Sequence, residues 1–204
     1  MLALPFKEIT MHPSRIALVL LLTGGLASAQ APAPKAAMDK APSTGQVLDR
    51  QLANLEREFV PAAEAMPEAT FAFTPGSGGF KGEFKTVKTF AEQVRHVASA
   101  NYMFAAGILG EKAPADLGGE NGPEALKTKA EIVKYLKDSF AYAHKALAGI
   151  TDANATTSIP SPWGKGTATR LGLATLTVSH GFDHYGQMAV YLRMNGIIPP
   201  ASRQ

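Results

Sequence analysis

Four long segments of this chain carry apolar residues at the spacing of an α-helix, and no stretch clearly alternates as a paired β-strand would. In each segment the apolar residues recur three and four positions apart, which places them on one face of a helix. Each segment stops at or just before proline, glycine or an Asn-Gly pair, which are residues that end helices. The sequence therefore predicts helices over residues 46–66, 86–109, 123–147 and 167–194, and an all-α, up-down four-helix bundle.

Two long connections are expected between these helices. Residues 71–84 (FAFTPGSGGFKGEF) join the first helix to the second, and their phenylalanines are placed to cover one end of the bundle. Residues 159–165 (IPSPWGK) lie between the third and fourth helices and contain the only tryptophan, Trp163. Connections of this kind are often functional. Trp163, Tyr102 and Tyr191 could line a pocket, although aromatic residues in a bundle are more often core.

The first 29 residues have the pattern of a secretory signal peptide. Lys7 and Arg15 precede an apolar run at residues 16–22 (IALVLLL), and the small residues Ala27–Ala29 (ASA) form a cleavage pattern before Gln30. The apolar run is shorter than the roughly 20 residues that a membrane-spanning helix needs. We therefore expect cleavage after ASA and a periplasmic or secreted protein without a stable membrane anchor.

Composition narrows the remaining organisation and chemistry. Residues 30–45 are rich in Ala and Pro, which is typical of a flexible linker, so the bundle domain is expected over residues 46–204. The absence of cysteine excludes disulfides, thiolate zinc sites, a cysteine nucleophile and covalent haem. The formal net charge of +3 is evenly spread, without a cluster of Lys and Arg, so nucleic acid is not an expected partner.

Two of the five histidines lie four residues apart in the motif HGFDH, residues 180–184. Positions i and i+4 share one face of a helix, so His180 and His184 project together toward the bundle interior. Burying them unpaired would cost about 1–3 kcal/mol each, and a His-x-x-x-His pair on a helix is a good clamp for a metal ion. Gly181 stands where a zincin-type protease has its glutamate base, which argues against a protease.

A third ligand is needed, and three other histidines are available. His12 lies in the predicted signal peptide, and His144 flanks the apolar stripe of the third helix, as a partly exposed surface histidine would. His96 lies at the edge of the stripe of the second helix, on a face shared with Glu92 and Gln93. This position fits a ligand that faces an open groove, and it fits an ordinary helix histidine equally well.

Three stretches of the sequence resemble the DinB-like family. They are FAFTPG, then TFAEQVRHVASANYMF around His96, then SHGFDHYGQMAVYLRMNGIIPPAS near the C-terminus, within a resemblance that runs from about Val47 to Ser202. The resemblance implies a four-helix bundle that binds a divalent metal through one histidine of the second helix and a His-x-x-x-His pair of the fourth. These positions correspond here to His96, His180 and His184.

The implied cofactor is a divalent transition metal, Zn, Ni or Fe. Imidazole ligation also suits Cu, and the ligand set does not choose among these metals. The remaining coordination positions would go to water, as in catalytic zinc sites. Three neutral imidazoles leave the metal fully charged, which acidifies a bound water.

The family includes metal-dependent hydrolase-like proteins and thiol-dependent transferases and isomerases. We expect an exported, metal-dependent, hydrolase-like enzyme acting on a small molecule. Glu92 and Asp183 are candidate general bases; alternatively, Glu92 is a solvated charge and Asp183 fixes an imidazole tautomer. Three other functions stay open. They are a non-catalytic, stress-related module that binds a metal or ligand, a thiol-dependent transferase, whose cytosolic thiols an exported protein would lack, and a haem bundle with His96 and His180 as axial ligands.

The fourth helix is also apolar on the side opposite the histidines. A helix that is apolar all round is usually buried on both sides, so either loops or a second subunit must cover this face. We expect a symmetric homodimer through this helix. The residues concerned are Leu171, Val178, Phe182, Tyr185 and Leu192.

Overall fold

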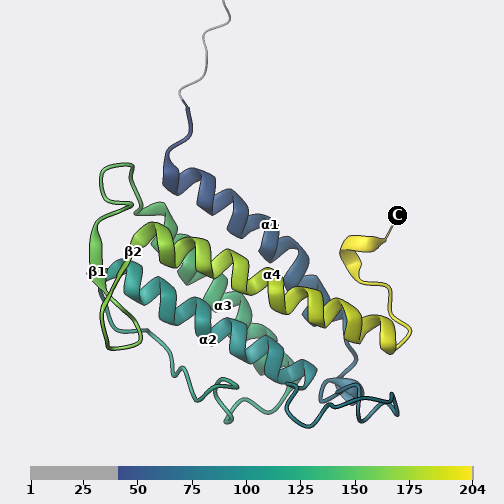
Figure 1. Cartoon of the computed structure of the whole chain (residues 1–204). Helices are drawn as coiled ribbons and strands as arrows, with labels where there is room; N and C mark the ends of the chain where they lie inside the picture. Colours follow the sequence, from purple (N-terminus) through teal and green to yellow (C-terminus); the bar gives the residue numbers. More distant parts are fainter. Residues whose placement is uncertain (1–40, 204) are drawn as a thin grey trace, which may run out of the picture. The chain divides into compact units, whose positions relative to one another are not determined.

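The computed structural model describes residues 41–203, so the predicted signal peptide and most of the predicted linker lie outside the described residues. The predicted all-α four-helix bundle is confirmed (Figure 1). No helix in the described part of the chain is long and apolar enough to cross a membrane. The elements are α1 (Thr44–Ala65), η1 (Glu68–Thr70), α2 (Phe90–Leu109), α3 (Lys129–Ala148), β1 (Ser158–Pro160), β2 (Thr167–Thr169), α4 (Arg170–Met194) and η2 (Pro200–Ser202).

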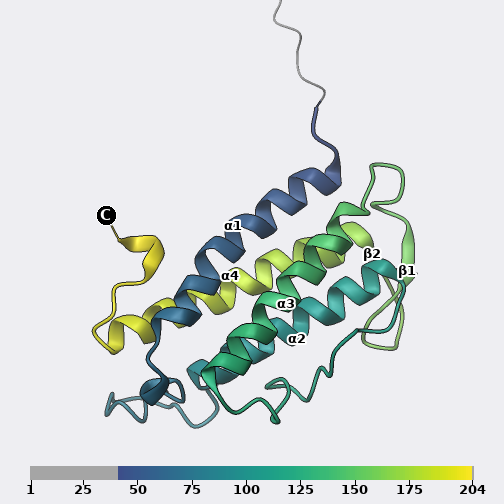
Figure 2. The ribbon, with the colours of Figure 1, turned by 180° about the vertical axis from the view of Figure 1, so that it is seen from behind.

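The four helices pack so that each contacts two others. Both α1 and α2 contact α3 and α4 (Figures 1 and 2). The helices α2 and α3 run in the same direction, since Ser99 at the middle of α2 bonds Tyr135 in the first half of α3, and Glu111, just past the end of α2, bonds Lys145 near the end of α3. The order of directions is therefore up, down, down, up, and simple alternation is broken between α2 and α3. The break is possible because residues 110–128 carry the chain back along the bundle (Figure 1).

Capping residues explain where two helices begin. Thr89 accepts from the backbone of Glu92 while the Glu92 carboxylate accepts from the backbone of Thr89, and Thr128 and Glu131 do the same for α3. This reciprocal arrangement satisfies backbone N–H groups that the first turn leaves unpaired. The second helix therefore starts at Phe90 and the third at Lys129, later than the expected starts at residues 86 and 123.

The connection between α3 and α4 contains a small sheet that the sequence analysis did not predict. Strand β1 pairs antiparallel with β2, with Ile159 opposite Ala168. Each strand has only three residues, which is too short for an alternating pattern to be recognised. The hairpin places Trp163 at its turn, beside the end of α2.

The phenylalanine-rich connection between α1 and α2 covers one end of the bundle, as expected. Phe71 and Phe73 are buried, and their carbonyl oxygens accept hydrogen bonds from the backbone of Ala91 and Phe90. The ring of Phe71 packs edge-on against Phe90, and that of Phe73 against Tyr191. These contacts fix the start of α2 against the end of α4.

Helices α1 and α4 approach closely at the glycine of the HGFDH motif. A Cβ atom added at Gly181 would lie 2.2 Å from Leu55 Cδ2, and Leu55 is fully buried. A side chain at this position would therefore clash with Leu55, which would have to move aside within the core. The close approach explains the glycine next to His180 and turns the two histidines toward α2.

Candidate metal centre

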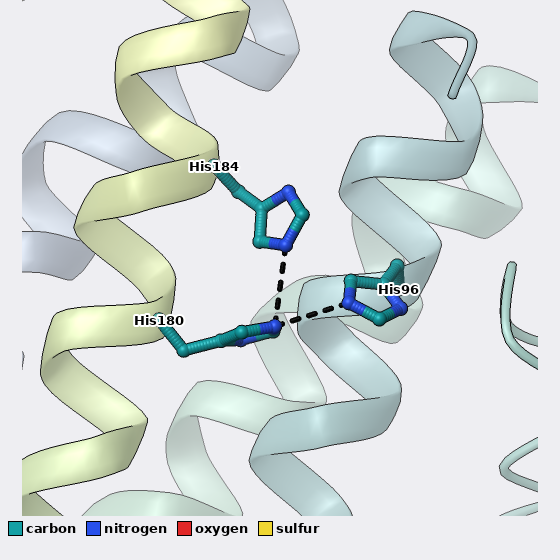
Figure 3. Close-up of side chains that lie close together, drawn as sticks. All are labelled: His96, His180 and His184. Atoms are coloured by element: carbon teal, nitrogen blue, oxygen red, sulfur yellow. Dashed lines mark hydrogen bonds between the residues drawn. The ribbon is translucent and has the colours of Figure 1, made fainter. Parts of the chain in front are cut away.

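The rings of His96, His180 and His184 come together between α2 and α4 (Figure 3). His180 Nε2 lies 3.0 Å from His96 Nε2 and 3.2 Å from His184 Nε2. The pair from α4 shares one helix face, and α2 brings His96 to it from the neighbouring helix. The structure thus assembles all three histidines singled out by the sequence analysis, with the same nitrogen of each ring directed to a common point.

The outer nitrogens of two rings are held by oxygen acceptors. His96 Nδ1 donates to the backbone carbonyl of Glu120 at 2.6 Å, and His184 Nδ1 donates to the side-chain oxygen of Gln93, which is 1% exposed. Because these oxygens can only accept, both rings carry their proton on Nδ1 and leave Nε2 with a free lone pair. His180 Nδ1 is buried and has no hydrogen-bond partner among the described residues.

Burial keeps the three imidazoles neutral. Burial, with a smaller contribution from His96, lowers the pKa of His180 to about 4, and burial, with smaller contributions from His180 and His96, lowers the pKa of His184 to about 3. Burial also lowers the pKa of His96, against the opposing effect of its bond to Glu120. At neutral pH the rings are therefore uncharged, which is the state in which imidazole binds a metal.

The geometry fits a divalent metal. Nitrogen ligands at about 2.0–2.1 Å from a tetrahedral zinc lie about 3.3–3.4 Å apart, close to the observed separations. Three lone pairs aimed at one point repel one another unless a cation lies among them. The haem alternative does not fit, because Nε2 atoms of His96 and His180 that are 3.0 Å apart leave no room for a porphyrin between them.

A chain of side chains extends behind His184. Gln93 Nε2 donates to Gln187 Oε1 at 2.8 Å, and Gln187 Nε2 donates to Asp183 at 3.3 Å. Asp183 accepts from Gln187, and the tautomer of His184 is held by Gln93 instead. The sequence places Gln93 on the face of His96, three residues before it, but does not identify it as a partner of His184.

The connection 110–128 supplies the acceptor for His96 and is anchored near it. Lys88 Nζ contacts Glu120 Oε1 at 3.1 Å and Asn121 Oδ1 at 2.8 Å, and Asn121 Nδ2 donates to Glu92 at 3.1 Å. The Glu92 carboxylate is thus engaged by Asn121 and by the cap of α2, rather than being a free base or a solvated charge. The role of Glu120 was missed because a carbonyl in an irregular loop leaves no pattern in the sequence.

The remaining predicted residues are not part of the three-histidine cluster, although Tyr191 bonds Gln93 and Trp163 lines a hollow together with His96. His144 is half-buried, and its two ring nitrogens face Asp49 and Glu56 of α1. Tyr102 and Tyr191 are buried in the core, whereas Trp163 is 57% exposed. Trp163 packs on Phe104, which in turn packs edge-on against His180.

Comparison with known proteins agrees with this fold. The family model of the DinB superfamily matches residues 51–188, and the chain belongs to this superfamily. The crystal structure of a DinB-like protein from Bacillus cereus ATCC 10987 has a similar fold, with a TM-score of 0.58 and 17% identity over 75% of this chain and 93% of that chain. A search of curated proteins found no match.

Proposed function

We propose that this protein binds one divalent transition metal, Zn, Ni or Fe, through His96, His180 and His184. The observation that carries the proposal is the convergence of three Nε2 atoms whose rings are neutral, two of them fixed by acceptors at Nδ1. Three protein ligands leave coordination positions open, as in catalytic rather than structural sites.

We further propose that the bound metal serves hydrolase-like chemistry on a small molecule. When bound, such a metal supplies Lewis acidity, which lowers the pKa of water and polarises carbonyl or phosphoryl oxygens. The chain contributes neutral ligands of fixed orientation, with Gln93 and the Glu120 carbonyl as the groups that hold them. Of the carboxylates considered from the sequence, Glu92 is engaged by Asn121 and Asp183 by Gln187, so the metal centre carries the chemistry in this proposal.

The proposed place of action is outside the cytoplasm. The support is the sequence pattern alone, with the apolar run at residues 16–22 and the cleavage pattern before Gln30. Mass spectrometry of the protein from fractionated cells tests this: a mature chain that begins at Gln30 is expected in the exported fraction. An intact N-terminus in the cytoplasmic fraction would contradict it, and would make thiol-dependent transfer the stronger candidate.

A hydrolysis screen tests the reaction class. Metal-loaded protein would be assayed on chromogenic esters, amides, lactones and phosphoesters beside His180→Ala, with Ser179→Ala as the matched control on the exposed side of α4. Turnover in the wild type and in Ser179→Ala, lost in His180→Ala, is the expected result. A protein that binds metal tightly but turns over none of these substrates at any metal would support a non-catalytic binding module.

A further inference from the structure

Two adjoining hollows run from the metal centre along α2. The first, of about 260 Å³, is lined by His96, Ser99, Ala100 and Met103 of α2, by residues 117–120 and by Trp163. The second, of about 330 Å³, continues along the same helix to Gly110 and is closed by Ala113, Leu117 and residues 160–162. The two hollows share Met103 and Leu117 and so lie next to each other along α2, and the pair is called here the α2 groove.

The shape of the α2 groove suits a long, narrow ligand. Its α2 wall runs from Ser99 to Gly110, which at 1.5 Å per residue is about 16 Å. Small side chains form much of that wall, and a Cβ at Gly107 would already lie 3.0 Å from Leu173 and 3.6 Å from Pro162. An extended chain fits this space better than a fused ring system does.

The chemistry of the walls is apolar and offers no positive charge. Alanine, glycine, proline, methionine and leucine dominate, and no lysine or arginine is among the described residues that line either hollow. The charged lining residues are carboxylates, Glu120 beside His96 and Glu111 toward the far end, and each is paired with a lysine outside the lining, Lys88 and Lys145. The rest of the lining is largely apolar, and such a groove favours a neutral apolar chain along its length.

The groove and the metal centre are in contact. His96 forms part of the groove wall, and Trp163 at its rim packs on Phe104, which touches the ring of His180. His96 is thus the histidine that faces the groove, and a polar group at the end of a bound chain would lie beside it while the apolar part lay along α2.

We propose that the α2 groove binds the unbranched apolar chain of a neutral small molecule, with its polar head at the three histidines. This proposal rests on the proposed function, because the head group is assigned to the metal. It names the substrate class as an amphiphile with a medium-length alkyl or acyl chain.

The only tryptophan of the chain is a built-in reporter for this binding, because Trp163 lies at the rim of the groove. The experiment titrates untagged, zinc-loaded protein with n-alkyl hydroxamic acids from two to ten carbons. Affinity is measured by calorimetry and Trp163 emission is followed in parallel. We expect affinity to rise about fourfold per methylene until the groove is filled, with a blue shift of emission for the long chains.

Two variants locate the effect. Ala113→Phe fills the second hollow and should abolish the dependence on chain length while two-carbon hydroxamate binds as before. Ala153→Phe, in an exposed turn away from the groove, is the control and should behave as wild type. An equal dependence on chain length in the Ala113→Phe protein would overturn the proposal.

The n-alkanols, which lack a metal-binding head, separate failure of the groove from failure of the metal site. If hydroxamates and alkanols of equal length bind with the same affinity and both shift Trp163 emission, the chain binds in the groove but the head group does not bind the metal. If all hydroxamates bind with the affinity of the shortest one and emission does not change, the groove proposal is wrong and the metal site stands.

Discussion

Gln93 is the side chain on which the orientation of His184 depends. It is 1% exposed and accepts from His184 Nδ1. Replacing it in Gln93→Leu keeps the volume but leaves that N–H buried and unpaired. Loss of such an outer partner typically weakens metal binding by about 10- to 100-fold. Competition with a chromophoric chelator would measure this loss as a higher Kd for zinc.

Gln187→Ala is the matched control for this change. It removes the bond that Gln93 donates but leaves the acceptor for His184 in place, so we expect a smaller loss of affinity. An unchanged Kd in Gln93→Leu would show that the ring of His184 does not need this partner.

The buried His184 and the half-buried His180 should make the metal-free protein sensitive to acid. In the folded state the pKa of His180 is about 4 and that of His184 about 3, below the usual 6.5 that they regain on unfolding. Below pH 6.5 the unfolded chain therefore binds more protons, and the free energy of unfolding falls as the pH drops from 6.5 toward 3. Urea titrations of apo protein at several pH values measure this slope.

The same titrations on His180→Gln/His184→Gln provide the comparison. Glutamine does not titrate, so the loss of stability between pH 6.5 and 4 should be smaller in this variant than in the wild type. Equal slopes would mean that the acid sensitivity comes from other groups.

Some residues of the metal centre can be predicted from the sequence and others cannot. The i, i+4 spacing was sufficient to place His180 and His184 together, because helix geometry alone fixes their common face. Helical periodicity left His96 undecided, and the family resemblance pointed to it. Gln93 and the Glu120 carbonyl were out of reach as partners, since both depend on which helix and loop lie opposite in space.

The contact between α1 and α4 can be tested with two glycines of the same helix. Gly181 faces Leu55, whereas a Cβ at Gly186 would meet no atom within 4 Å. We expect Gly181→Ala to lower the free energy of unfolding by about 1–3 kcal/mol through overpacking. Gly186→Ala should raise it by up to about 1 kcal/mol, because alanine is the better helix former. Chemical denaturation measures both.

Equal effects of the two substitutions would contradict the close approach of these helices. If Gly181→Ala were as stable as Gly186→Ala, Leu55 would have to move aside without cost, which a fully buried side chain rarely does.

The helices themselves were predictable, and their starts were less so. Periodicity located all four, since each buries one apolar face. The starts of α2 and α3 were misplaced because the apolar pattern and a proline were followed instead of the Thr-x-x-Glu sequences at Thr89 and Thr128. These capping sequences are legible without a structure and would have corrected both starts.

The path of the chain through the bundle was the part least visible in the sequence. The predicted start of the third helix at residue 123 makes the expected connection before it shorter than the real one, and a short connection favours an antiparallel neighbour. The actual connection, residues 110–128, is long enough to return the chain and let α2 and α3 run parallel. The same segment lines the α2 groove and supplies the acceptor for His96.

Assembly of the whole molecule is the next expectation to test. On the outer side of α4, Val178, Phe182 and Tyr185 are half-buried and Leu192 is fully buried within the chain, while Val190, farther round the helix, is 50% exposed. We propose that a second copy covers this face, and light scattering at micromolar concentration should give the mass of a dimer. Val190→Glu should shift the mass toward the monomer because a charge would be buried in the interface. A monomer mass for the wild type would refute the dimer.

Metal content is the most direct test of the central claim. Mass spectrometry of the untagged protein, after brief dialysis, should find about one Zn, Ni or Fe per chain. His96→Ala and His184→Ala should lose it while circular dichroism shows unchanged helix content. His144→Ala, outside the centre, should keep it. A wild-type protein that holds no metal even after reloading, or variants that hold as much as the wild type, would contradict the claim.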